Sequence, residues 1–155
     1  MPTPTPAREY FLSLLDEAFD KQAWHGPNLR GALRGVSPRL AAWRPAAARH
    51  NIWELAVHAA YWKYTVRRRL TGEKKGSFAL EGSDFFLRPQ EETEEAWKAD
   101  LALLAREHRL LRETVAKLPP LDFTAKAART IQGAAMHDVY HAGQITLLKR
   151  MAPKD

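Results

Sequence analysis

Cysteine is absent from this chain of 155 residues. Its absence excludes a disulfide framework, a cysteine nucleophile and thiolate ligands for a metal ion. Any bound metal must therefore be held by histidine, aspartate or glutamate side chains. The missing cysteine does not decide the cellular compartment.

Long apolar runs are missing as well. No stretch approaches the roughly 18 apolar residues that a membrane-spanning helix needs, and the opening MPTPTPAREY lacks the apolar run of a signal peptide. We therefore expect no membrane segment and a cytoplasmic location. Hydrophobic residues make up 45% and charged residues 27% of the chain, which is a globular balance. The length suits one domain over residues 1–155.

The period-2 alternation of β-strands is almost lacking. Apolar residues instead recur at helical spacing in four segments that proline and glycine separate. The predicted helices cover residues 7–24, 51–72, 90–118 and 129–151, with a short additional helix near 28–35. A long connection, about 71–89, joins the second long helix to the third. The pattern predicts an all-α fold, a four-helix bundle with a long crossover between its second and third helices.

Basic residues exceed acidic ones, and the formal net charge is +6. Such a balance is compatible with nucleic acid or an anionic substrate. The arginines and lysines are scattered, however, and the densest run is only RRRL followed by GEKK. A solvated basic surface explains this pattern better than a nucleic-acid site does.

Two histidines stand four residues apart in MHDVYHAGQITLLKR, within the last predicted helix. Residues at this spacing share one helix face, so His137 and His141 are candidate ligands of one metal ion. Both fall on the face that should meet the core, where buried imidazoles need partners. The zinc-protease motif has glutamate after its first histidine, but Asp138 stands there, so that chemistry is not indicated.

A third ligand has to come from elsewhere in the chain. His58 lies inside the second predicted helix, and His108 lies in the apolar seam of the third. His25 stands beside a helix-ending Gly-Pro and His50 just before a helix N-cap, positions typical of loop histidines. The residues alone leave His58 and His108 open as alternatives.

Four stretches together are similar to one known family. They are WHGPNLRGALRG, HNIWELAVHAAYWKYTVRRRLTG, FFLRP with EEAWKADLALL, and MHDVYHAGQITLLKR. From the first helix onward, the chain resembles the DinB-like (DNA-damage-inducible) superfamily of small metal-binding bundles. There a histidine of the second helix and a His-x-x-x-His pair of the fourth bind one divalent metal. The resemblance implies His58, His137 and His141 as the ligands here, in preference to His108.

Three histidine ligands with open coordination positions are typical of catalytic metal sites. Imidazole ligands suit zinc or nickel, while iron, cobalt and manganese stay open. Glu54 and Gln144 lie within one turn of a ligand and are candidates to orient an imidazole or a bound water. For each of them, a capping or solvent-facing role fits at least as well. Tyr61, Tyr64 and Tyr140 are candidates to line the pocket, although aromatic packing suits each of them better.

The resemblance implies a metal-dependent enzyme. Some relatives are thiol-dependent S-transferases or isomerases, in which the metal holds a low-molecular-weight thiol cofactor as thiolate. A second variant is a hydrolase that uses metal-activated water on a small-molecule substrate. The alternative is a non-catalytic metal-binding stress or scaffold protein. For either class we expect a homodimer with a role in stress response or detoxification, without membrane or nucleic-acid partners.

Overall fold

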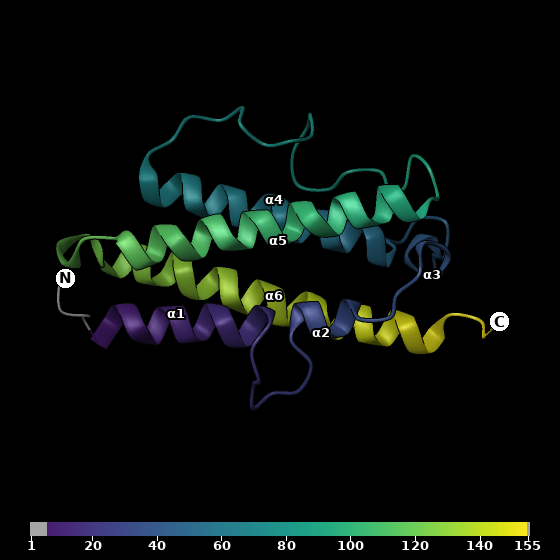
Figure 1. Ribbon diagram of the computed structural model, residues 1–155, viewed down its shortest axis with the longest axis horizontal. Coiled ribbons are helices and arrows are strands. Elements are labelled where there is room, and N and C mark those ends of the chain that lie inside the picture. The colour runs from purple at the N-terminus through teal and green to yellow at the C-terminus, as the bar shows by residue number, and fades with distance from the viewer. Residues whose placement is uncertain (1–5, 155) are drawn as a thin grey trace.

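Four long helices build the protein in the computed structural model, which describes residues 6–154 (Figure 1). They are α1 (Pro6–Phe19), α4 (Ile52–Thr71), α5 (Glu94–Lys117) and α6 (Ala125–Met151). Shorter elements, α2 (Leu29–Leu33), α3 (Pro38–Ala42) and the 3-10 turn η1 (Pro120–Asp122), lie between them. No strand occurs within residues 6–154. The prediction of an all-α bundle is confirmed.

The helices pack as a bundle with a long external crossover. α4 packs against α5 and α6, and α1 packs against the same two helices. In Figure 1, α4 and α5 run in one direction while α1 and α6 run in the other. The segment 72–93 returns the chain along the outside of the bundle from the end of α4 to the start of α5. Along the described chain, no helix combines the length and the apolar character that crossing a membrane would require.

Both ends of α4 follow the capping signals in the sequence. The side chain of Asn51 accepts the backbone N–H of Glu54 at 2.8 Å, which satisfies one unpaired donor of the first turn. Gly72 closes the helix with φ of 76°, a left-handed conformation that glycine adopts without steric cost. The side chain of Glu54 bonds to Arg44, His50 and the backbone N–H of Arg88.

Three predicted helix limits were wrong. The first helix ends at Phe19 rather than 24, because the chain turns there and lets Leu29 be buried in α2. The third begins at Glu94 and the fourth at Ala125, since Thr93 and Thr124 cap their first turns through side-chain oxygens. The short helix predicted near 28–35 corresponds to α2, and α3 is a further short helix that was not predicted.

The apolar core has two parts with a polar layer between them. One cluster includes Leu104 and Ala142, the other includes Leu111 and Ala135. On α5 the buried His108 lies between the two clusters, and on α6 the buried Asp138 does so. Lys63 of α4 reaches into this layer, where its Nζ donates to Asp138 Oδ2 and lies 3.2 Å from His108 Nδ1. A buried ion pair therefore interrupts the apolar interior.

The crossover is tied down by its aromatic and charged residues. Phe78 and Phe86 pack against Tyr61, with ring centroids 5.4 and 5.7 Å apart. Arg88 donates twice to the carboxylate of Asp100 on α5, both at 2.8 Å. The crossover therefore packs on the bundle. Tyr61 and Tyr64 are almost fully buried and serve this packing.

Candidate metal centre

Three histidines from two neighbouring helices meet in the bundle. His137 and His141 stand one turn apart on α6, and His58 faces them from α4. His137 Nε2 lies 3.1 Å from His58 Nε2 and 3.0 Å from His141 Nε2. One nitrogen of each ring lies within 4.8 Å of the others, a spacing at which the three could hold one metal ion. The structure thus brings together the three residues that the family resemblance implied.

The outward nitrogens of two rings have fixed partners. His58 Nδ1 lies 2.9 Å from the backbone carbonyl oxygen of Asp84. His141 Nδ1 lies 2.6 Å from Oε1 of Gln144. A carbonyl oxygen only accepts, so both Nδ1 atoms carry the hydrogen and both Nε2 lone pairs point inward. Partners of this kind fix the tautomer and orientation of metal-binding histidines.

Burial keeps the three imidazoles neutral. It lowers the pKa of His58, although the Asp84 carbonyl and carboxylate oppose it. Desolvation and the neighbouring histidines lower the pKa of His137 to about 3. Desolvation also lowers the pKa of His141 to about 4, against the hydrogen bond that His141 donates to Gln144. The Nε2–H of a neutral His137 could bond to only one of the two facing nitrogens at a time, whereas a cation among them can bind all three nitrogens at once. The donor set fits a divalent metal.

A groove opens beside these rings. Its volume is about 730 Å³, within the range of small-molecule sites. Apolar side chains form most of the wall, among them Leu55, Phe85 and Leu148, while Arg49 and His50 add polar groups. Tyr140 and Leu147 of α6 also line it and remain more than half exposed. Tyr140 is thus the one candidate tyrosine that faces the groove.

A family model matches most of the chain. The model of the DinB superfamily matches residues 21–147, which include α2 through most of α6 and all three histidines. The chain belongs to the DinB superfamily. Comparison with curated proteins and with solved structures gave no match.

In this DinB-superfamily chain, Glu54 was a candidate to orient a metal-binding imidazole. It bonds instead to His50, which lies outside the trio. Arg44 donates to both of its oxygens, at 2.7 and 2.6 Å, and His50 Nδ1 lies 3.0 Å from Oε1. The backbone N–H of Arg88 adds a bond at 3.1 Å. Burial alone would raise the pKa of Glu54, but the bonds from Arg44, His50 and Arg88 outweigh it and lower the pKa to about 2. Gln144, by contrast, holds His141 directly.

The other histidines lie apart from the trio. His108 belongs to the polar layer, where desolvation, Lys63 and Arg112 lower its pKa to about 2. It also groups with Asp16 and Asp20 at a spacing suited to a metal. Arg112, however, already donates to both oxygens of Asp16. His25 is exposed in the loop after α1.

Sequence reasoning missed the contributions of Asp84 and Phe85. Phe85 stacks on the His58 ring, with centroids 3.8 Å apart, and Asp84 holds its outer nitrogen. Both lie in the non-periodic crossover, which offers no local signal for such contacts. The contact between His50 and Glu54 could have been predicted from the sequence, because the two residues are four positions apart.

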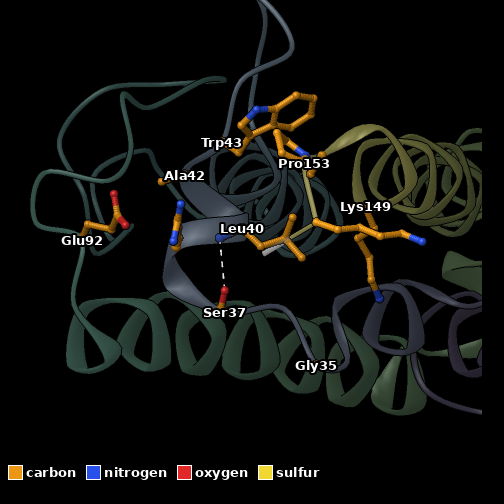
Figure 2. Close-up of a pocket in the computed structure, with 11 residues that line it drawn as sticks. Gly35, Ser37, Leu40, Ala42, Trp43, Glu92, Lys149 and Pro153 are labelled. Carbon is orange, nitrogen blue, oxygen red and sulfur yellow. Dashed lines mark hydrogen bonds between the residues drawn. The ribbon is translucent and has the colours of Figure 1, made fainter.

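A second pocket lies where α3 meets the C-terminal end of α6 (Figure 2). It has a volume of about 520 Å³ and shares no lining residue with the histidine groove. The Lys149 ammonium donates there to the carbonyl oxygens of Ala32 and Arg34, at 2.9 and 3.0 Å. Glu92 is its one carboxylate and the described lining holds no histidine, so we assign no metal to it.

Proposed function

We propose that this protein binds one divalent cation through His58, His137 and His141 and is a metal-dependent enzyme acting on a small molecule. The observation that carries the proposal is the convergence of three inward Nε2 atoms beside an open, mainly apolar groove. Three protein ligands leave coordination positions for an added ligand, whereas structural zinc sites are usually closed by four. Zinc or nickel suits the imidazoles best, with iron, cobalt or manganese as further candidates.

We infer that the nucleophile is a low-molecular-weight thiol, which makes the reaction an S-transfer or isomerisation. A divalent cation in the site supplies Lewis acidity, which lowers the pKa of a thiol or water by several units. The chain has no cysteine of its own, so the sulfur must arrive with the ligand. Arg49 is exposed at the groove and suits a thiol that carries a carboxylate.

The chain's own residues would orient and shelter that ligand. Asp84 and Gln144 hold the rings of His58 and His141 before anything binds, so the nitrogens need no rearrangement. Phe85 and the leucines of the groove exclude water from one side of the reacting atoms. A dry wall strengthens electrostatic interactions with the ligand.

Metal content and a thiol titration test the proposal. Protein purified without added metal is expected to contain about one divalent ion per chain by elemental analysis, and His137→Ala almost none. Addition of glutathione, mycothiol or bacillithiol should then change the visible spectrum of the cobalt-substituted protein. A spectrum that none of the three thiols changes would refute the thiol reaction. Hydrolysis of 4-nitrophenyl acetate by the same sample would then favour the water-dependent reaction.

We further propose that the protein is a homodimer. Met136, Tyr140, Leu147 and Met151 leave more than half of their surface exposed along α6. Exposed apolar side chains gathered on one helix are typical of protein interfaces. Light scattering after size exclusion should give twice the mass of the chain, and a monomeric mass would refute the dimer.

A further inference from the structure

His50 stands at the groove with one ring nitrogen already engaged. Its Nδ1 lies 3.0 Å from Oε1 of Glu54, an ionised carboxylate that can only accept. Nδ1 therefore carries the hydrogen, and Nε2 keeps its lone pair. About half of the His50 side chain is exposed, so solvent and a ligand in the groove can reach this ring. The pair has the arrangement in which a carboxylate orients an imidazole for proton transfer.

The carboxylate of this pair is itself rigidly held. Arg44 donates to both oxygens of Glu54, and the backbone N–H of Arg88 donates to one of them. Glu54 is 3% exposed, so its position is set by packing as well as by these bonds. An acceptor fixed in this way holds the His50 ring in one orientation and stabilises the imidazolium after proton uptake.

An aromatic stack places the His50 ring beside the metal ligands. Phe85 stacks on His50 with centroids 3.7 Å apart, and on His58 with centroids 3.8 Å apart. Two rings in face contact with one phenyl ring must occupy its opposite faces. His50 therefore lies one phenyl ring away from a candidate ligand, too far to bind the same cation. His50 nevertheless lines the same groove as His58 and His141.

We propose that His50 is the general base and acid of the groove and that Glu54 is its positioning residue; this inference rests on the proposed function. Nε2 of His50 accepts the proton of the thiol, or of water in the hydrolytic variant. The S–H bond breaks, the electron pair stays on sulfur, and a new N–H bond forms on His50. The imidazolium then returns that proton to the leaving group or product, which restores the neutral ring. Glu54 keeps the other ring proton throughout.

Several charged or titratable groups surround His50. Glu54 accepts its Nδ1–H, and Arg44 pairs with the same carboxylate. The neighbouring Arg49 adds positive charge at the rim of the groove. Beyond Phe85 lie His58 with its partner Asp84, and His141.

Imidazole nitrogen NMR tests the arrangement without any reaction. In the zinc-loaded full chain, neutral His50 is expected as the Nδ1–H tautomer, with Nε2 bare. Assignment comes from the signal that disappears in His50→Gln. An Nε2–H tautomer for neutral His50 would overturn the proposal, because Nε2 would then hold no lone pair for a proton.

A pH–rate profile tests the chemistry. With glutathione and 1-chloro-2,4-dinitrobenzene as probes, zinc-loaded His50→Gln is expected to react about 100-fold more slowly than the parent at neutral pH. Its metal content should be unchanged, and the rising limb of the profile that reports deprotonation of the base should vanish. His25→Gln makes the same change on an exposed loop histidine and should behave as the parent does.

Glu54→Gln separates the positioning role from a merely structural one. The amide can still accept the His50 N–H, but it lacks the charge that favours the imidazolium, so the rising limb should move to lower pH. An unmoved limb would overturn the role of Glu54. If His50→Gln keeps the parental rate and profile, the role of His50 alone is refuted. A parent that converts neither the thiol probes nor 4-nitrophenyl acetate refutes the proposed function, and this role with it.

Discussion

The histidine trio and the polar layer both bury imidazole rings in the same bundle, but only the trio is open to a groove. His137 and Asp138 are consecutive on α6, yet one belongs to the trio and the other to the layer. The trio is open to a groove and holds three neutral nitrogens. The layer is closed, and the ammonium of Lys63 already lies 3.2 Å from His108 Nδ1.

The two sites differ in the positive charge that contacts their histidines. In the polar layer the chain supplies its own cation, Lys63, and a carboxylate to neutralise it. A metal ion next to that ammonium would be repelled. In the trio no lysine or arginine contacts the inward nitrogens among the described residues, so a cation from outside can fill that place. Substitutions in the trio and in the polar layer test this difference.

The largest effect is expected from His137→Ala. His137 Nε2 is the atom that lies within 3.1 Å of both other rings. Removing a residue that only holds a metal ligand in place typically lowers metal affinity about 10–100-fold. Removing the His137 ring itself should lower the affinity further and leave almost no metal in the purified protein. Elemental analysis measures this, with His108→Leu as the matched control that keeps its metal. Loss of metal from His108→Leu but not from His137→Ala would show that His108, and not His137, is a metal ligand.

Breaking the buried ion pair should mainly affect stability. Lys63→Met leaves the fully buried Asp138 without its partner and should lower the free energy of unfolding by about 3–5 kcal/mol. Urea denaturation of the metal-free protein measures this difference. The double variant Lys63→Met/Asp138→Leu should recover most of the loss, because neither charge is then buried. A single variant as stable as the parent would contradict the closed character of the layer.

Gln144→Ala should weaken the metal site without destroying it. Gln144 accepts the Nδ1–H of His141 at 2.6 Å and fixes that ring. Loss of such a partner typically lowers metal affinity about 10–100-fold. Competition with a chelator of known affinity measures the change, and Gln132→Ala on the exposed surface of α6 is the control. Equal affinities in the two variants would show that His141 needs no such support.

The smallest effect concerns acid sensitivity. The pKa of His108 is lowered to about 2 in the folded protein, against about 6.5 in an unfolded chain. Between these values the unfolded state binds the extra proton, so the free energy of unfolding falls as pH falls below about 6.5. His108→Leu should reduce that slope by about 1.4 kcal/mol per pH unit. Urea titrations of metal-free protein at pH 6 and 5 measure it; parallel curves would contradict a buried neutral His108.

Local features of the sequence predicted most of the fold. Helical spacing gave the four long helices, and the signals at Asn51 and Gly72 gave both ends of α4. The pairing of His137 with His141 is also local, because a helix brings every fourth residue to one face. The missed starts of α5 and α6 depended on threonine caps, which are weak signals within polar stretches.

The rest of the candidate site depends on which helices become neighbours. His58 and His108 both face inward, and periodicity alone cannot say which one meets α6 beside its histidine pair. That choice depends on the three-dimensional packing, and only the family resemblance pointed to His58. Asp84 and Phe85 reach the site through the irregular path of the crossover, which no spacing rule describes.

Helices and loops contribute different parts of the candidate site. Asp84 and Phe85 lie on the crossover, and Arg49 and His50 lie on the segment before α4. The helices supply the ring nitrogens, while these two segments add Arg49, His50 and Phe85 to the wall of the groove. A loop can be exchanged without repacking the bundle, since connecting segments tolerate change far better than buried helix faces. Grafting these two segments from another family member should therefore alter the choice of ligand while the histidine scaffold stays intact.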